Sequence, residues 1–189
     1  MKKNSIIFGL IMLASGCAFA PHNANIAIEQ APSIAKIEDQ GSALYLQVVD
    51  ERDETDLGRR GAGIAAAKIT ADGIYKEFSN AVKSGFQAKG YSLVSNKSDA
   101  SAELLVGLRT LKFEESTGFL TVGAEADATI IADAERGNED YRKQYRVSDE
   151  DRQIAVSFGE GIDAQLSQVL NKALNKLFHD HELDEFLTK

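Results

Sequence analysis

Residues 119–134 read Phe-Leu-Thr-Val-Gly-Ala-Glu-Ala-Asp-Ala-Thr-Ile-Ile-Ala-Asp-Ala and hold the longest strand signal of the chain. Small or apolar residues alternate there with mostly polar ones, a period of two that is typical of a strand with one buried face. The face expected to be buried holds Leu120, Val122, Ala124, Ala126, Ala128, Ile130, Ala132 and Ala134. Because most of these side chains are short, a helix can lie close against this strand. The stretch therefore predicts a sheet with a helix packed on one face.

Further strand signals lie on both sides of this stretch. Gly137-Asn138 suits a hairpin turn, and residues 141–147 alternate after it. Residues 148–153 are polar and are expected to form a loop. Upstream, residues 102–113 alternate, and residues 43–50 are expected to form a central strand.

Two amphipathic helices are expected beside these strands. The first begins near Ile74 and ends at Gly90, and the second spans residues 162–177. Residues 179–189 are expected to form a short turn of helix folded back on the body. The order strand, helix, strand, strand, strand, helix predicts an α+β domain with a mostly antiparallel sheet of about four strands and two amphipathic helices on one face. The other face would be solvated or would meet a partner.

The start of the chain is typical of an export signal. Residues 1–16 combine a basic start with an apolar run that is too short to span a bilayer. Cys17 directly follows Ala14-Ser15-Gly16, which resembles the lipobox of bacterial lipoproteins, in which the cysteine is acylated and becomes the first residue. Two alternatives are plain secretion with cleavage after Ala20, and a chance cysteine inside a signal.

The remaining chain is expected to divide into two parts. Residues 17–42 would be a lipidated cysteine and a flexible tether, and residues 43–189 a single periplasmic domain. As a coil, the tether would hold its ends roughly 25–30 Å apart, although Ile26 and Ile28 allow a short strand docked on the domain. By resemblance to the lipoprotein sorting rule, Ala18 implies delivery to the outer membrane, facing the periplasm.

The charge balance restricts the partners. The chain has 21 Lys and Arg against 29 Asp and Glu, a net charge of −8. Such a surface disfavours nucleic acid and anionic head groups, because both bind through clusters of Lys and Arg. Cys17 is the only cysteine, so its acylation would leave no thiol for a disulfide.

Three stretches could bind a ligand, and each has a simpler interpretation. Residues 61–66 match the G-x-G-x-x-A spacing of a dinucleotide loop, but an acidic loop separates them from the preceding strand, so a Gly-Ala loop is favoured. The acidic residues 50–56 could gather calcium but lack the calcium-loop spacing. A structural or interaction loop of Asp50, Arg52 and Gly58, shaped by pairing between Asp50 and arginine, is favoured. His179 and His181 are favoured as surface residues over zinc ligands.

No catalytic set is recognisable in the sequence. No G-x-S-x-G elbow occurs, and the histidines and the single cysteine support no nucleophile pair. Carboxylates on the wet strand faces could contain an acid and base pair, but solvated faces usually carry such charges; they are Glu103, Glu125, Asp127 and Asp133. Arg142 and Arg146 can face the acidic side of the preceding strand. The sequence therefore predicts no catalytic residue, no metal and no cofactor.

Several short stretches, taken in order and spacing, resemble the YajG family of small Gram-negative outer-membrane lipoproteins. They are Val48-Val49-Asp50-Glu51-Arg52 with Gly58, Gly85-Phe86-Gln87-Ala88-Lys89-Gly90-Tyr91, Ala128-Thr129-Ile130-Ile131-Ala132, Tyr145-Arg146-Val147 and Asp184-Glu185-Phe186-Leu187. The resemblance implies a lipid-anchored periplasmic domain with no enzymatic activity and no catalytic residues to carry over. The arrangement is also similar to that of envelope lipoproteins that serve as accessory subunits, a likeness of fold alone.

Three functions remain open at this point. The first is a non-enzymatic domain, anchored in the outer membrane through acylated Cys17, that binds an envelope protein or supports an assembly. The second is a small-ligand or peptide binding module that uses a cleft or a sheet edge. The third is a periplasmic hydrolase, which would need clustered carboxylates with perturbed pKa values.

Overall fold

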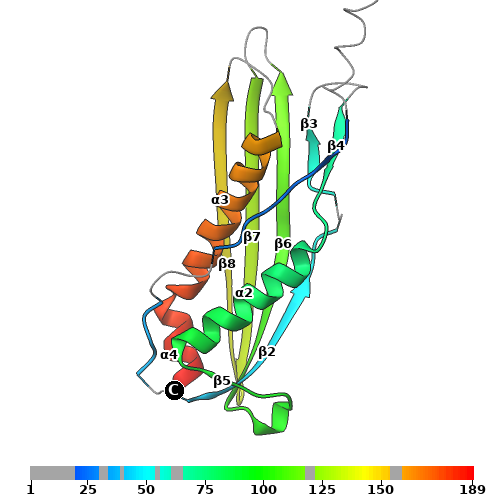
Figure 1. The fold of residues 1–189 in the computed structure, drawn as a ribbon. Coiled ribbons are helices and arrows are strands. Elements are labelled where there is room, and N and C mark those ends of the chain that lie inside the picture. Colours follow the sequence, from blue (N-terminus) through cyan, green and yellow to red (C-terminus); the bar gives the residue numbers. More distant parts are fainter. Residues whose placement is uncertain are drawn as a thin grey trace, which may run out of the picture.

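The computed structural model describes residues 20–29, 34–38, 41–53, 56–60, 66–117, 122–153 and 159–189. The predicted signal peptide, Cys17 and most of the Gly-Ala loop at residues 61–66 lie outside these ranges. Within them the chain forms one mixed sheet with helices against one of its faces (Figure 1). The elements are β1 (His22–Asn23), β2 (Ala43–Asp50), β3 (Gly58–Arg60), β4 (Ala67–Thr70), α2 (Ile74–Lys89), β5 (Ser92–Leu93), η3 (Lys97–Asp99), β6 (Ala102–Thr117), β7 (Val122–Arg136), β8 (Glu139–Gln153), α3 (Gly159–Phe178) and α4 (His181–Thr188).

Strand β6 is the centre of the sheet. One of its edges pairs antiparallel with β7, which pairs antiparallel with β8. Its other edge pairs in parallel first with β2, from Leu44↔Ala102 to Asp50↔Leu108, and then with β3, at Gly58↔Phe113. The short strands complete the sheet, because β4 pairs with β3, β1 with β4, and β5 with β2.

The predicted α+β class is confirmed, but the mostly antiparallel sheet of about four strands is wrong in two respects. The sheet is mixed, since β2 and β6 are parallel. Helix α2 lies between these strands in the chain, and a helix that crosses between neighbouring strands makes them parallel. The sheet also has eight strands among the described residues. Four of them, β1, β3, β4 and β5, have two to four residues, too few to show an alternation.

The predicted hairpin is confirmed, with Gly137 and Asn138 between β7 and β8. The predicted loop at residues 148–153 is wrong, because β8 continues to Gln153 and pairs there with Val122. The charged side chains of this stretch conceal the strand in the sequence. They are compatible with it because β8 lies at the edge of the sheet.

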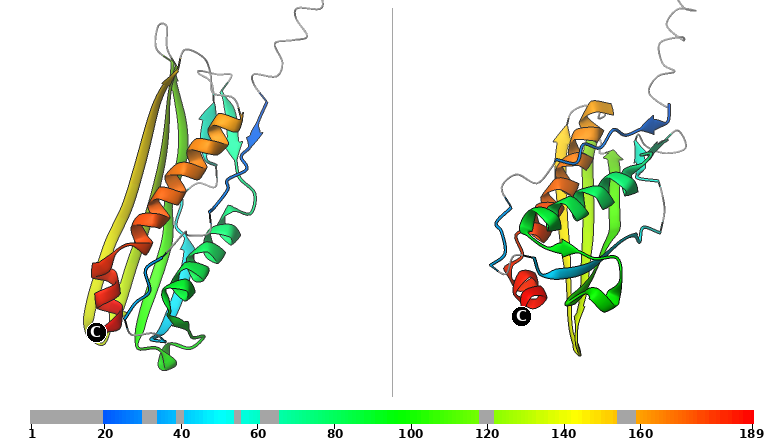
Figure 2. Two further views of the ribbon diagram at one scale, coloured as in Figure 1. Left: turned by 60° about the vertical axis from the view of Figure 1, so that its left-hand side comes forward. Right: turned by 60° about the horizontal axis from the view of Figure 1, so that its bottom comes forward.

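The core lies between the sheet and the helices. Figure 2 shows α2, α3 and α4 on one side of the sheet, while no helix of the described residues covers the other side. The inward residues of β7, from Ala124 to Ala134, are at most 1% exposed, so this part of the predicted buried face is confirmed. Leu120 lies outside the described residues. The buried face of α3 consists of Ile162, Leu166, Val169, Leu170, Ala173 and Leu177.

The ends of the two predicted helices also follow the sequence. Gly90 has a φ of 107° and closes α2, since a residue without a Cβ adopts this conformation most easily. Helix α3 ends at Phe178, one residue beyond the predicted span. The tail forms α4, and its buried Leu183 and Leu187 pack against the body as predicted.

Candidate functional site

The predicted loop residues Asp50 and Arg52 lie together at the end of β2. The Arg52 guanidinium donates from Nε and Nη2 to the two oxygens of Asp50, at 2.7 Å each. These bonds from Arg52 lower the pKa of the Asp50 carboxyl. The side chain of Arg52 is only 6% exposed, and its Nη1 has no hydrogen-bond partner in the structure. The expected pairing of Asp50 with an arginine is thus present at the start of the loop, and the role of the loop stays a prediction.

Gly58 holds the far end of the same loop against β6. Its φ is 110°, and a Cβ at this position would lie 2.0 Å from the backbone oxygen of Phe113. Leu57 closes the junction, since its backbone oxygen accepts from Phe113 N at 2.6 Å. Gly58 therefore has a structural role in joining β3 to β6, and the structure brings it no closer to a reactive group.

The uncovered face of the sheet carries rows of opposite charge. Asp127 and Asp133 on β7 pair with Arg146 and Arg142 on β8, at 3.0 and 3.1 Å. The prediction that these arginines face the acidic side of the preceding strand is thus confirmed. The pairs explain how neighbouring strands tolerate so many charges on one face. We call this surface the outer face.

A hollow of about 420 Å³ lies on the outer face, over β6, β7 and β8. Its lining combines three basic side chains, three carboxylates and three uncharged polar side chains: Arg109, Lys112, Arg146, Glu114, Glu125, Asp127, Thr110, Thr129 and Gln144. Two of the four carboxylates considered for catalysis, Glu125 and Asp127, meet here, but Glu125 accepts from Ser148 and Asp127 from Arg146. Glu103 pairs with Lys97 and Asp133 with Arg142 elsewhere on the face. The hollow thus offers mixed charges to a polar partner.

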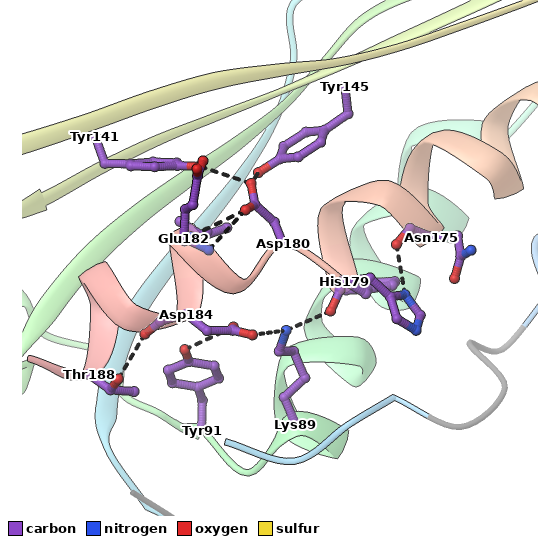
Figure 3. Close-up of polar contacts among 12 residues, drawn as sticks. Lys89, Tyr91, Tyr141, Tyr145, Asn175, His179, Asp180, Glu182, Asp184 and Thr188 are labelled. Atoms are coloured by element: carbon purple, nitrogen blue, oxygen red, sulfur yellow. Dashed lines mark hydrogen bonds and ion pairs between the residues drawn. The ribbon is translucent and has the colours of Figure 1, made fainter. Parts of the chain in front are cut away.

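A second polar cluster, which the sequence analysis missed, ties α4 to the sheet (Figure 3). Asp180 Oδ2 accepts from the hydroxyls of Tyr145 and Tyr141 at 2.6 and 2.8 Å, and it lies 3.0 Å from Lys143 Nζ. Oδ1 of Asp180 accepts from the backbone of Glu182 and Leu183, so the same carboxylate caps the start of α4.

Buried Lys89 joins α4 to α2 and α3 in a similar way. Its Nζ donates to the last carbonyl of α3, at Phe178, and to Asp184 of α4, at 2.6 and 2.7 Å. The hydroxyl of Tyr91 donates to the other oxygen of Asp184 at 3.3 Å. Lys89 is 1% exposed and stands at the negative end of the α3 dipole.

The pKa shifts in these clusters follow from burial and pairing. Burial raises the pKa of Asp180, but the hydrogen bonds from Tyr145, Lys143 and Tyr141 outweigh it, so the net shift is downward. Burial, and then the Asp180 carboxylate, raise the pKa of Tyr145. Burial and the charge of Asp184 do the same for Tyr91. Both phenols therefore stay protonated and act as donors that hold α4 in place. In the sequence, the signal for this cluster is the stretch at residues 184–187, which is the last of those that resemble the YajG family.

The structure gives the other predicted ligand residues ordinary partners. The first histidine of the pair, His179, lies between α3 and α4, and its Nδ1 is 2.9 Å from the carbonyl of Asn175. His181 is exposed at the start of α4. In the part of the chain that the structure describes, no group of three or more His, Cys, Asp or Glu side chains could hold a metal ion.

Part of the predicted tether lies on the domain. Ala27 N and Glu29 N donate to Ser167 and Asn171 of α3, and His22 Nε2 lies 2.7 Å from Asp163. The three α3 residues are spaced by four and therefore share one face of the helix. Ala24 and Ile26 are buried beside them, at 6% and 4% exposure. We call residues 20–29 the strap.

Comparison with known families places the chain. Residues 29–188 match the family model Lipoprotein_16, described as uncharacterized lipoprotein. The chain belongs to this lipoprotein family. Membership implies a lipid anchor. The matched range begins at residue 29, so Cys17 as the lipidated residue stays a prediction.

The search of solved structures finds several that are similar to this lipoprotein. Protein XCC0632 from Xanthomonas campestris, assigned to family DUF330, superposes with a TM-score of 0.58 at 10% identity, over 89% of this chain and 95% of that one. A putative neuraminyllactose-binding hemagglutinin homolog from Helicobacter pylori gives 0.43 at 10% identity, over 84% and 96%. The PelC dodecamer from Paraburkholderia phytofirmans gives 0.31 at 7% identity, over 75% and 94%. At these identities the first likeness shows a common fold alone.

Two further findings complete the comparison. A search among curated proteins gives no match to this lipoprotein. None of the helices in the described ranges is long and apolar enough to cross a membrane.

Proposed function

We propose that this lipoprotein is of the YajG type, anchored through acylated Cys17 in the outer membrane, and that its domain binds another envelope protein through the outer face. The domain would have no catalytic activity of its own. The observation that carries the proposal is the outer face itself, which no described helix covers and which holds a charged hollow of about 420 Å³ (Figure 2).

The outer face suits a protein partner in three ways. Its strands β6, β7 and β8 form a continuous surface, and exposed polar side chains such as Gln144 stand on it. The ion pairs from β7 to β8 are partly exposed, so they contribute little to stability and can exchange partners at small cost. The hollow provides both signs of charge, which favours specific orientation of a polar partner.

We propose the absence of catalysis because the candidate groups already have partners within the domain. Four carboxylates of the outer face pair with lysine, arginine or serine side chains; they are Glu103, Glu125, Asp127 and Asp133. Asp180, Asp184 and Lys89 are committed to holding α4, and their donors and acceptors are mutually satisfied. Each of these charged groups already has a partner within the domain, which supports a structural role over a catalytic one.

A small-ligand or peptide binding module is the alternative, and the same hollow supports it. Its lining is polar and charged, so the ligand class would be a polar peptide or a zwitterionic small molecule. A ligand of this kind would bind the purified domain alone, whereas an envelope protein must be supplied.

The anchor is tested by intact-mass analysis of protein purified from membranes, beside a Cys17→Ala variant. The expected mass is that of residues 17–189 with a diacylglycerol and an acyl chain, and the variant should lack both. A lipid-free mass that begins at Pro21 would contradict the anchor.

The partner surface is tested by photocrosslinking in intact cells, with benzoylphenylalanine at Gln144. The matched control carries the crosslinker at Lys83, an exposed residue of α2 on the other side of the sheet. A discrete protein adduct from position 144 that is missing from position 83 is expected. Equal adducts from the two positions, or none, would contradict binding through the outer face.

A further inference from the structure

We infer that the strap holds the β3–β4 end of the domain directly against the lipid surface, instead of a long tether that lifts the domain clear of it. This inference rests on the proposed anchor at Cys17. It names the surface of the domain that meets the membrane, and its occupant, the lipid head groups beside the anchor.

The attached part of the chain begins at Ala20, next to β3. Arg60 Nη2 of β3 donates to the backbone oxygen of Ala20 at 2.8 Å, and β1 then pairs with β4 at His22↔Ile69. Ala24 N donates to Thr70 O at 2.6 Å directly after this pairing. The chain is therefore attached to the end of β3 and β4 from its first described residue onward.

Hydrogen bonds and buried apolar side chains hold the strap on the domain along its length. Asn23 and Asp72 are joined by two hydrogen bonds, of 3.0 and 3.2 Å. Asn171 binds the strap twice, accepting from Glu29 N and donating to the carbonyl of Ala27. With Ala24 and Ile26 buried, the strap has both an apolar and a polar reason to stay on the domain.

Only a short length of chain remains between Cys17 and the attached strap. Ala20 is three residues after Cys17 along the sequence, and even a fully extended chain spans only about 10–11 Å over three residue steps. The predicted free tether of residues 17–42 would have allowed roughly 25–30 Å. The acyl chains lie in the bilayer, so Ala20 and the adjoining β3 lie within one head-group layer of it.

The charges at this end fit such a position. Arg59 and Lys68 are exposed on neighbouring strands, and Lys68 shares a contact of 3.4 Å with Asp56. Arg60 Nε has no hydrogen-bond partner in the structure. Although the whole chain is acidic, the side chains of β3 and β4 beside Ala20 are locally basic, which suits anionic head groups.

The test uses the absence of tryptophan from the native chain. One variant, Lys68→Trp, carries a single tryptophan at the β3–β4 end, and the matched variant Asp140→Trp carries one beside the β7–β8 hairpin. The strand registers place Lys68 level with Glu125 and Asp140 level with Glu135. Ten residues of β7 therefore separate the two levels by about 33 Å. Both proteins are purified with their lipid and placed in vesicles that contain lipids brominated near the head group.

The expected result is about a twofold loss of emission at position 68 and no loss at position 140, since a bromine atom quenches only at short range and the two positions differ by about 33 Å. Insertion of twelve Gly-Ser residues between Phe19 and Ala20 should abolish the loss at position 68. Intact mass is measured on every sample. Acylated protein with equal quenching at the two positions, or with quenching at 68 that survives the insertion, overturns the inference and leaves the anchor standing. Protein without lipid removes the anchor and the inference together.

Discussion

The two faces of β7 differ in burial and in charge, although they belong to the same 15 residues. On the inner face every residue from Ala124 to Ala134 is at most 1% exposed, and α3 packs on it. On the outer face Asp127 and Asp133 pair with exposed arginines of β8. Burial of apolar surface stabilises strongly, whereas exposed ion pairs contribute little. The inner face therefore holds the fold, and the outer face is free to change with a partner.

The outer face is not uniformly exposed to solvent. Ile131 is 1% exposed there, and Thr129 is 7% exposed. Ile131 lies opposite Gly107 of β6, and Glu51 also reaches this glycine and pairs with Arg109 at 3.1 Å. A small buried patch around Ile131 and Gly107 thus lies within the polar surface.

The largest effect should come from the inner face. Ile130→Ala removes a fully buried side chain beneath the helices and should lower the free energy of unfolding by about 2–5 kcal/mol. Gln144→Ala on the outer face is the control and should stay within about 0.5 kcal/mol. Urea unfolding followed by circular dichroism measures both. Similar losses for the two variants would break the comparison.

Ion pairs should show the same contrast. Lys89→Met leaves Asp184, whose side chain is 18% exposed, without its ammonium partner. Removal of one partner of a buried pair costs about 3–5 kcal/mol, and the partial exposure of Asp184 reduces our expectation to about 2–3 kcal/mol. Lys97→Met, which breaks the exposed pair with Glu103, should leave the free energy of unfolding nearly unchanged. A loss for Lys97→Met as large as that for Lys89→Met would contradict the distinction.

Two glycines test the same contrast by adding volume. A Cβ on Gly85 of α2 would lie 2.3 Å from the ring of Phe178, which is itself packed edge-on against Phe86. Gly85→Ala should therefore cost about 1–3 kcal/mol, as overpacking usually does. On the outer face, a Cβ on Gly107 would lie 2.8 Å from Ile131 Cγ1 and 3.0 Å from the flexible end of Glu51.

A Cβ on Gly107 is easier to accommodate than one on Gly85, since the Glu51 side chain can move toward solvent. Gly107→Ala should cost less than Gly85→Ala in the same unfolding experiment. The double variant Gly85→Ala with Phe178→Leu should recover part of the loss if the ring is the obstacle. No recovery would place the strain in the backbone of α2.

Low pH should weaken the attachment of α4. The folded-state pKa of Asp180 is lowered, so its contribution is fully present above the unfolded value of about 3.9 and is lost as the pH falls through the folded-state pKa. Asp180→Asn should cost about 1–2 kcal/mol at pH 7, because the tyrosine and lysine donors lose a charged acceptor.

The difference between Asp180→Asn and the native protein should shrink as the pH is lowered below about 4, where the carboxyl of the unfolded chain takes up a proton. It should vanish below the lowered folded-state pKa of Asp180, where the native carboxyl is protonated too. Unfolding midpoints measured at several pH values test this. A difference that is constant down to pH 2 would show that Asp180 contributes by shape and not by charge.

The smallest effect is expected from the outer ion pairs. Arg142→Gln breaks the pair with Asp133, and the side chains of these residues are 64% and 38% exposed. The expected cost is about 0–0.5 kcal/mol. A double-mutant cycle with Asp133→Asn measures the pair directly. A coupling above about 1 kcal/mol would mean that the outer face also stabilises the fold.

The sequence was sufficient where one short-range pattern decides the structure. The alternation of residues 119–134, the turn at Gly137 and the apolar face of α3 predict β7, the hairpin and the main helix. The pairing of Asp50 with Arg52 was also open to prediction, because the two residues are close along the chain.

Tertiary structure alone decided the features that join distant residues. The parallel pairing of β2 with β6, the hydrogen bond from Lys89 to Asp184 and the docking of the strap on α3 link positions 58 to 144 residues apart. Such contacts depend on which faces meet when the core closes. The end of β8 escaped prediction because its pairing with β7, and not apolar side chains, keeps it extended. Local periodicity thus determined the elements of this lipoprotein, and closure of the core decided which polar groups anchor α4 and which stay available on the outer face.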